Sequence, residues 1–370
     1  MKISFIRTFL ICFFITISFS AIDAQNDTIM LTANDGPYII HKENSTQYIQ
    51  VEDGELTIKE RANNQPFWVT SHDGKHKFEV RLHKIERPQW RYEQPDKMLI
   101  LSDPHGNLEA FLSVLNSQGI INNKYEWNWG KGHLFIIGDV FDRGDDVLPI
   151  FWLIYKLEAE ALKAGGQVHF VLGNHEEMIL RNNIRYTNKK YKNLAEKLGI
   201  EYRELWNRRS ELGYWLMTRN TIEVIGNNLF VHAGLSKEFL EDDWQIPQLN
   251  EMISSFLYMT KEQRENSADA KFLFGSNGPI WYRGMVRDDE KYNPLSEENV
   301  DKILQKYNVG RIYVGHTIFD EVSRFYDGKV IGVNVSNQKN MDAGKSRGIL
   351  VDGLKTYIIY DTPGKRIEIH

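Results

Sequence analysis

The stretch LFIIGDVFDRG, residues 134–144, decides how this sequence is interpreted. It opens with an apolar run, 134–137, whose length and composition are typical of a buried β-strand. Gly138 follows, and a glycine lets the backbone turn sharply beside a close neighbour. Asp139 and Asp142 then place two carboxylates directly after the strand. The stretch therefore predicts a central strand whose end presents acidic groups.

Potential metal ligands follow four further apolar runs in the same way. In an α/β sheet the carboxyl ends of parallel strands face one crevice, so side chains at these ends are expected to meet in space. Besides Asp139, these side chains are Asp103 and His105 after Leu101, Asn174 and His175 after Leu172, His232 after Val231, and His316 after Val314. The sequence therefore predicts one site that is built from widely separated parts of the chain.

The predicted ligand set contains only oxygen and nitrogen donors. Such donors favour manganese, iron or zinc over copper(I) or iron–sulfur clusters. The set is too large for one catalytic ion with an open position, and it fits a pair of ions about 3.5–4 Å apart that share a carboxylate and a hydroxide. Two divalent metal ions are therefore the expected cofactors, and their net positive charge would attract phosphate.

The chain after residue 94 alternates apolar runs with amphipathic segments, which is typical of α/β architecture. Segments 107–116 and 146–163 have helical periodicity, and 185–217 is interpreted as a helical insertion. Beyond Val322 the pattern returns to strands. We expect residues 95–370 to form a catalytic domain in which a sandwich of two mixed sheets is flanked by helices.

The segment 25–94 is rich in short strand patterns and turns, and we expect a small β-rich N-terminal domain there. Asp53-Gly54 and Asp73-Gly74 are residue pairs that hairpin turns favour. Three histidines fall in this segment without carboxylates at metal-binding spacing, so they are interpreted as polar strand residues. They are His72, His76 and His83.

Residues 1–24 have the order of a secretory signal peptide, with basic, then apolar, then small side chains. An uncleaved membrane anchor is the alternative, although the apolar run 9–17 is shorter than the roughly 20 residues that a spanning helix needs. We expect cleavage near Ala24, a periplasmic or secreted protein, and no stable membrane insertion afterwards. The single cysteine, Cys12, lies in this run, so the mature chain would have no disulfide and no thiolate nucleophile.

The bulk composition excludes further classes of protein. Hydrophobic residues make up 42% of the 370 residues, as in a globular protein with a substantial core. The formal net charge is -5, so the chain offers no general basic field for nucleic acid, and nucleic acid is not an expected partner.

Five motifs stand at the predicted strand ends, at 103–106, 138–144, 173–176, 232–234 and 315–316. Together they resemble the motifs of the calcineurin-like metallophosphoesterases, and within these the chain is similar to the phosphoprotein phosphatase group. A narrower resemblance to the Shewanella-like phosphatases rests on three more segments. These are 210–216, 229–236 and 278–284.

The resemblance implies that six side chains hold the two metal ions. Asp139 would bridge the ions, and the first ion would also bind Asp103 and His105. The remaining ligands of the second ion would be Asn174, His232 and His316.

The resemblance also implies the reaction, which is hydrolysis of phosphate monoesters. A hydroxide that bridges the metal ions would attack phosphorus in line with the leaving group. His175 would protonate the leaving oxygen, and Asp142 would orient His175. Arg143 and Arg283 would bind the phosphate, because the arginine fork matches its oxygens.

From the sequence, three functions remain open. The first is a phosphoprotein phosphatase that acts on phosphorylated protein or peptide, with phosphotyrosine as a candidate substrate. The second is hydrolysis of dinucleoside polyphosphates or another small phosphate ester. The third, a binding module without turnover, is disfavoured because His175 and every expected ligand are present.

The insertion 185–217 is expected to overhang the crevice, because it lies between two of the motif strands. We expect part of its aromatic residues, with Arg208 or Arg209, to form a wall for the substrate. The aromatic residues considered are Tyr186, Tyr191, Tyr202, Trp206, Tyr214 and Trp215.

Overall fold

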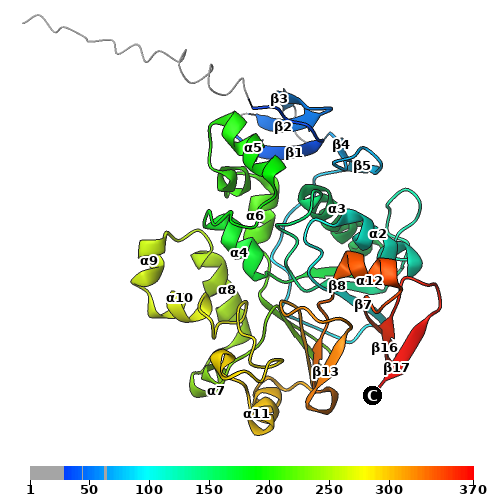
Figure 1. Cartoon of the computed structure of the whole chain (residues 1–370), viewed down its shortest axis with the longest axis vertical. Helices are drawn as coiled ribbons and strands as arrows, with labels where there is room; N and C mark the ends of the chain where they lie inside the picture. Colours follow the sequence, from blue (N-terminus) through cyan, green and yellow to red (C-terminus); the bar gives the residue numbers. More distant parts are fainter. Residues whose placement is uncertain (1–28, 44, 62–64) are drawn as a thin grey trace, which may run out of the picture.

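The computed structural model describes residues 29–43, 45–61 and 65–370, so the predicted signal peptide 1–24 lies outside the described residues. Two six-stranded sheets form the centre of the molecule, and helices cover them (Figure 1). Both sheets mix parallel and antiparallel pairs. The predicted sandwich of two mixed sheets flanked by helices is therefore confirmed.

The first sheet has the order β17-β16-β15-β7-β8-β9. Its parallel strands are β7 (Lys97–Leu101), β8 (His133–Ile136) and β9 (Gln167–Phe170). An antiparallel extension continues from β7 through β15 (Gly348–Asp352), β16 (Lys355–Ile359) and β17 (Arg366–Ile369).

The second sheet has the order β13-β14-β12-β11-β10-β6. Its central strands β11 (Asn228–Val231), β12 (Arg311–Val314) and β14 (Val330–Gly332) are parallel. The flanking strands are β13 (Ser323–Phe325), β10 (Ile222–Ile225) and β6 (Arg91–Tyr92).

The layer between the two sheets is formed by alternate residues of their strands. On β7, Met98 and Ile100 belong to this layer, whereas Leu99 belongs to the larger core under the helices. Phe230 joins the sheets, because its ring stacks on Phe135 of β8 at 4.0 Å and on Tyr313 at 5.1 Å. A strand buried on both faces has a continuous apolar sequence, which explains the runs that precede the ligands.

Helices α2 (Leu108–Ser117) and α3 (Val147–Ala164) match the predicted segments 107–116 and 146–163. The Asn107 side chain caps α2 by accepting a hydrogen bond from the backbone N–H of Ala110, at 3.1 Å. A further helix, α12 (Asn337–Ala343), packs against α2. Its region was predicted to contain only strands, and this part of the prediction is wrong.

The remaining helices follow the motif strands. The predicted insertion contains α5 (Lys189–Leu198), the 3₁₀ turn η1 (Tyr202–Trp206) and α6 (Glu211–Met217), after α4 (Asn174–Leu180). Between β11 and β12 lie α7 (Glu238–Glu241), α8 (Ile246–Phe256), α9 (Lys261–Glu265), α10 (Ala268–Leu273), η2 (Glu290–Tyr292) and α11 (Glu297–Tyr307). A last 3₁₀ turn, η3 (Tyr326–Gly328), links β13 to β14.

The N-terminal strands form a separate sheet of β1 (Asp35–His41), β2 (Thr46–Glu52) and β3 (Glu55–Arg61), followed by the hairpin of β4 (Phe67–Thr70) and β5 (Lys77–Val80). Both expected turn pairs lie between hairpin strands. This region is not isolated from the rest of the chain. The ring of Phe67 lies 4.9 Å from that of Trp152 on α3, and Tyr38 lies 5.9 Å from Trp206.

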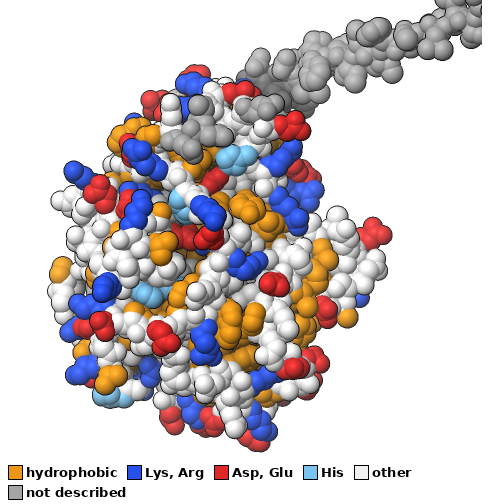
Figure 2. Space-filling model, turned by 180° about the vertical axis from the view of Figure 1, so that it is seen from behind, with side chains coloured by type: hydrophobic (Ala, Val, Ile, Leu, Met, Phe, Trp, Pro, Cys, Tyr) orange, Lys and Arg blue, Asp and Glu red, His pale blue; other side chains and the backbone are white. Residues whose placement is uncertain are grey.

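The surface of the described residues carries charges of both signs. Figure 2 shows Lys, Arg, Asp and Glu side chains interspersed with apolar ones, without a broad field of one sign on this face. Within the described ranges, no helix combines the length and the apolar character that crossing a membrane requires.

Candidate active site

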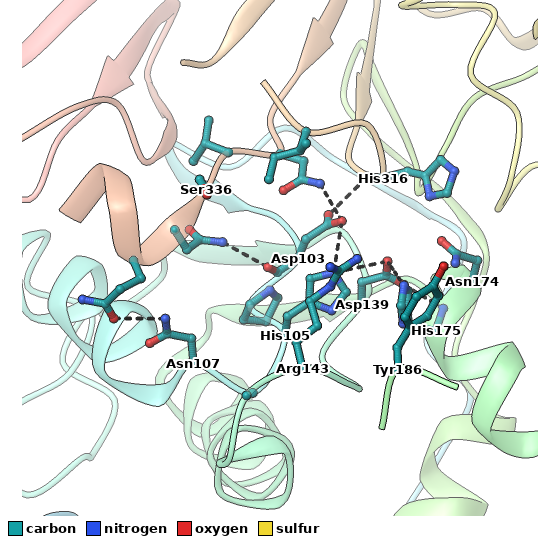
Figure 3. A pocket seen from close by; sticks show the side chains of 18 of the residues that line it. Asp103, His105, Asn107, Asp139, Arg143, Asn174, His175, Tyr186, His316 and Ser336 are labelled. Carbon is teal, nitrogen blue, oxygen red and sulfur yellow. Dashed lines mark hydrogen bonds and ion pairs between the residues drawn. The ribbon is translucent and has the colours of Figure 1, made fainter. Parts of the chain in front are cut away.

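The loops after five strands bring the predicted site residues together. Asp103 and His105 follow β7, Asp139 follows β8, Asn174 and His175 begin the helix after β9, and His232 and His316 follow β11 and β12. Figure 3 shows several of these side chains converging on one pocket. Its cavity volume is about 730 Å³. The prediction that these strand ends meet in space is confirmed.

The loops achieve this convergence with unusual backbone conformations. Six non-glycine site residues have positive φ angles, which cost roughly 1–3 kcal/mol each and persist only where the surroundings enforce them. They are Asp103 (48°), His105 (43°), Asp139 (55°), Asp142 (71°), Arg143 (69°) and His316 (58°). Gly173 is needed for close approach, because a Cβ atom there would lie 2.2 Å from Oδ1 of Asp139.

Asp139 lies at the centre of the potential metal ligands. One group consists of Asp139, His105 and His175, and another of Asp139, His232 and His316. Oδ2 of Asp139 is 3.8 Å from Nε2 of His105 and 3.2 Å from Nε2 of His232. Because Asp139 belongs to both groups, its carboxylate would be available to two metal ions when they are bound.

The histidines are prepared to act as ligands through Nε2. The Nδ1–H group of His105 donates to the carbonyl oxygen of Phe141 at 2.7 Å, and that of His232 donates to Ile137 at 2.8 Å. Such bonds leave Nε2 of each ring directed into the centre. Burial opposes a charge on His232, yet the carboxylate of Asp139 raises its pKa to about 9, so a metal ion would have to displace that proton. Among the residues that the structure describes, Nε2 of His316 is buried and finds no hydrogen-bond partner. The donors present therefore fit divalent metal ions.

Burial favours the neutral form of two of these histidines. It lowers the pKa of His105 to about 4 and the pKa of His316 well below its ordinary value. Burial also raises the pKa of Asp103 to about 7. Neutral imidazole is the form that binds a metal ion.

Asn334 holds Asp103 and was not predicted from the sequence. Its Nδ2 donates to Oδ2 of Asp103 at 2.8 Å, and the backbone N–H of His316 donates to Oδ1 at 3.2 Å. Asn334 itself is buried. No sequence signal distinguishes this asparagine, because it is 231 residues from its partner.

Glu176 is a second residue that the sequence did not single out for a role. Its buried carboxylate accepts backbone N–H bonds from Asp139 (2.9 Å), Val140 (2.9 Å) and Gly173 (2.8 Å). These bonds tie the loop after β8 to the start of α4. Glu176 thereby positions Asp139 relative to Asn174 and His175.

His175, Asp142 and Thr187 form a buried chain of hydrogen bonds. The Nδ1–H group of His175 donates to Oδ2 of Asp142 at 2.6 Å, and the Thr187 hydroxyl donates to Oδ1 at 2.7 Å. Burial opposes a charge on His175, yet the nearby carboxylates of Asp139 and Asp142 raise its pKa. Nε2 of His175 remains directed toward the centre, 3.9 Å from Oδ2 of Asp139.

Both predicted phosphate-binding arginines line the same pocket. Arg143 is exposed and extends over the ring of Tyr186, with Cζ 5.6 Å from the ring centroid. Nη1 of Arg283 donates to the Thr317 hydroxyl at 3.0 Å. Burial lowers the pKa of Arg283, although such a guanidinium stays charged at neutral pH.

The insertion contributes less to the pocket than the sequence suggested. Tyr186 lines the pocket and is 46% exposed, with its ring 5.5 Å from that of His175. Tyr191, Tyr202, Trp206 and Trp215 are core residues. Tyr214 lines a different pocket together with Arg208 and Arg209. The predicted substrate wall with Arg208 or Arg209 is therefore wrong, since the turn of the chain directs both arginines elsewhere.

His72 also differs from its prediction as a polar strand residue. It lies in the turn between β4 and β5 and lines the catalytic pocket. Its backbone N–H and its ring Nδ1–H donate to the carboxylate of Asp146, at 2.6 and 2.7 Å. His76 and His83 also lie outside the strands. The N-terminal hairpin therefore contributes directly to the wall of the pocket.

Comparisons with known proteins agree with this geometry. The family model "Calcineurin-like phosphoesterase" matches residues 97–319. The chain is 27% identical over 320 residues to Shewanella-like protein phosphatase 2 of Arabidopsis thaliana, covering 72% of this chain and 75% of that protein. It is 30% identical over 233 residues to an uncharacterised protein of Schizosaccharomyces pombe, covering 61% and 68%.

Solved structures give a similar result. The cold-active protein-tyrosine phosphatase of a psychrophilic Shewanella species superposes with a TM-score of 0.83 at 30% sequence identity. The superposition covers 92% of this chain and 100% of the Shewanella chain. The superposition therefore covers more of this chain than the residues 97–319 that the family model matches.

Proposed function

This chain belongs to the calcineurin-like phosphoesterase family and is a protein phosphatase-like hydrolase, and we propose that phosphotyrosine in proteins or peptides is its preferred substrate. The family and the Shewanella-like phosphatase relatives support the reaction class. The preference for phosphotyrosine is our inference. It is supported by the name of the similar Shewanella enzyme and by one feature of the pocket.

That feature is the Tyr186 ring beside His175. His175 is the proposed acid, so the oxygen that leaves phosphorus must depart next to it. For phosphotyrosine, this oxygen is attached to an aromatic ring. Tyr186 is 46% exposed and 5.5 Å from His175, and Arg143 and Arg185 lie over its ring. The part of the ring that stays exposed offers an aromatic surface against which the leaving phenol can pack.

We propose two divalent metal ions, of manganese, iron or zinc, as cofactors. The first would be held by Asp103, His105 and Asp139, and the second by the ligand set Asp139, Asn174, His232 and His316. When bound, such ions acidify a water molecule and offset the charge of the phosphate.

The chain itself contributes positioning and proton transfer. Arg143 and Arg283 bind the phosphate oxygens that point away from the ligands. His175 carries a proton at Nε2 for the leaving oxygen, and Asp142 keeps that atom directed at the centre. Burial of Asp142 and His175 restricts the access of water to this proton.

Export remains a proposal that rests on residues 1–24 alone. We propose that the mature protein begins near Gln25 outside the cytoplasm. N-terminal sequencing of the protein from its native cells tests this, and a cytoplasmic protein that retains Met1 would contradict it.

A side-by-side kinetic panel tests the substrate preference. Phosphotyrosine, phosphoserine and phosphothreonine peptides of one sequence are compared with diadenosine tetraphosphate, each with manganese. We expect the highest kcat/KM for phosphotyrosine. Higher kcat/KM for the dinucleotide or for phosphoserine would overturn the preference.

Two variants connect the preference to the pocket. An aromatic pair contributes about 0.5–1.5 kcal/mol, so Tyr186→Ala should lower kcat/KM for the phosphotyrosine peptide roughly 2–12-fold. Its effect on the phosphoserine peptide should be smaller, because that leaving group has no ring. Tyr214→Ala is the matched control, since Tyr214 is 42% exposed but lines a different pocket.

A further inference from the structure

Four arginines line the catalytic pocket, which is more than one phosphate requires. Besides Arg143 and Arg283, they are Arg185 and Arg287. Within residues 29–43, 45–61 and 65–370, none of the four forms an ion pair with a carboxylate. The pocket therefore contains four guanidinium groups that have no carboxylate partner within ion-pair distance among the described residues.

The two outer arginines are held in place without being neutralised. Arg185 is exposed, and its Cζ lies 4.7 Å from the ring centroid of Tyr186. Arg287 is also exposed, lies 5.2 Å from the ring centroid of Phe319, and donates to the carbonyl oxygen of Ile318 at 3.4 Å. Stacking on a ring orients a guanidinium and leaves its N–H groups available to an anion.

Apart from the candidate metal ligands Asp103 and Asp139, the acidic groups of the pocket already have hydrogen-bond partners among neighbouring side chains. Asp146 binds His72, Asp145 accepts a hydrogen bond from Asn188 at 2.9 Å, and Glu109 lies 3.0 Å from Nε2 of His76. These acids therefore do not satisfy the arginines. An anionic ligand from outside the chain would do so.

The outer arginines lie near different catalytic side chains. Arg185 precedes Tyr186 and thus lies on the side of His175. Arg287 donates to Ile318, in the segment that follows His316. The ring of Trp281 lies 5.8 Å from that of His316 in the same part of the pocket. A peptide that places its phosphate between them would bring residues flanking the phosphorylated one close to both.

We propose that Arg185 and Arg287 select acidic residues on either side of the phosphotyrosine in the substrate. This inference rests on the proposed function, since it concerns the same pocket. It defines the substrate class as an acidic phosphotyrosine-containing segment, in which carboxylates supply the partners that the two guanidinium groups lack.

Peptides that differ only in their flanking residues test the proposal. Three phosphotyrosine peptides of equal length carry Glu, Gln or Lys at the positions next to the phosphotyrosine. Exposed ion pairs are individually weak, so for the wild-type chain we expect kcat/KM with Glu to exceed that with Gln roughly fivefold. Added salt should reduce this ratio, because it screens exposed charges.

The variants Arg185→Gln, Arg287→Gln and their combination identify the residues responsible. The double variant should bring the Glu-to-Gln ratio close to one. Arg208→Gln is the matched control, because Arg208 also stacks on a tyrosine, 5.3 Å from the ring centroid of Tyr258, but lines another pocket. The Arg208→Gln variant should keep the wild-type ratio of kcat/KM between the Glu and Gln peptides.

The outcomes separate this inference from the proposed function. Equal kcat/KM for Glu, Gln and Lys peptides in the wild type would overturn the inference, while a preference for phosphotyrosine over phosphoserine in the Gln peptides would leave the proposed function standing. A Glu preference that persists in the double variant would also overturn it. Loss of the phosphotyrosine preference itself would instead refute the proposed function.

Discussion

Oδ2 of Asp142 accepts a hydrogen bond from the Nδ1–H group of His175 at 2.6 Å. Both residues are buried, and the opposite ring nitrogen of His175 is left facing the potential metal ligands. A histidine held in this way can deliver a proton repeatedly to the same point in the pocket.

The first prediction concerns this proton. His175→Asn should lower kcat for alkyl phosphates roughly 10²–10⁴-fold, because an alkoxide needs protonation to leave. The loss for p-nitrophenyl phosphate should be much smaller, since nitrophenolate is a stable anion. Steady-state kinetics on both esters provide the check, and equal losses would argue against His175 as the acid.

The second prediction concerns Thr187, which positions Asp142. Thr187→Val removes a hydroxyl hydrogen bond of 2.7 Å and should lower kcat for alkyl phosphates about 5–10-fold. Thr187→Ser should restore most of the activity, because it keeps the hydroxyl. Thr218→Val removes a comparable bond, to the carbonyl oxygen of Trp215, and serves as the control. If Thr187→Val affected KM alone, the positioning role would be wrong.

The third prediction concerns Glu176. Glu176→Gln weakens the acceptor for three buried N–H groups, and we expect the free energy of unfolding to fall by roughly 2–4 kcal/mol. Denaturant titration measures this change. Glu251→Gln, an exposed position on α8, should be nearly neutral. A Glu176→Gln variant as stable as the wild type would contradict this account of the loops.

The fourth prediction links pH to stability at the junction of β1 and α6. A hydrogen bond to Glu211 at 2.5 Å raises the pKa of His41 above its ordinary value of 6.5. The protonated pair therefore stabilises the fold below about pH 6.5, and this contribution is lost as the pH rises through the raised pKa.

His41→Gln isolates that contribution. The pair is partly exposed, so its effect is small, and we expect the wild type to exceed the variant in Tm by about 1–3 °C at pH 6. The difference should shrink at pH 9. Thermal unfolding at both pH values measures it, and a difference that grows with pH would show that the sign is wrong.

The sequence predicted where the candidate ligands lie for a physical reason. Asp103, Asp139 and His232 each follow a buried strand within three residues, so the strand pattern also fixes where these side chains lie. Strand ends in one crevice are a property of the α/β architecture. The approximate positions of side chains at strand ends can therefore be inferred from the sequence.

The parts that the sequence could not predict depend on tertiary contacts. Thr187 reaches Asp142 because the backbone N–H of Arg143 binds the carbonyl oxygen of Tyr186, a contact that has no local sequence pattern. His72 enters the pocket because a hairpin packs on α3. Arg208 was expected to lie at the pocket, yet the position of a side chain in a helical insertion depends on how the insertion folds over the core.

The central claim is that Asp139 joins two metal ions in a hydrolytic centre. The most direct measurement is metal content per chain together with turnover, for the wild type, for Asp139→Asn, and for Asp320→Asn as an exposed control. We predict about two ions per wild-type chain, unchanged in the control, and a folded Asp139→Asn variant with fewer ions and almost no turnover. An Asp139→Asn variant with wild-type metal content and full activity would contradict the account.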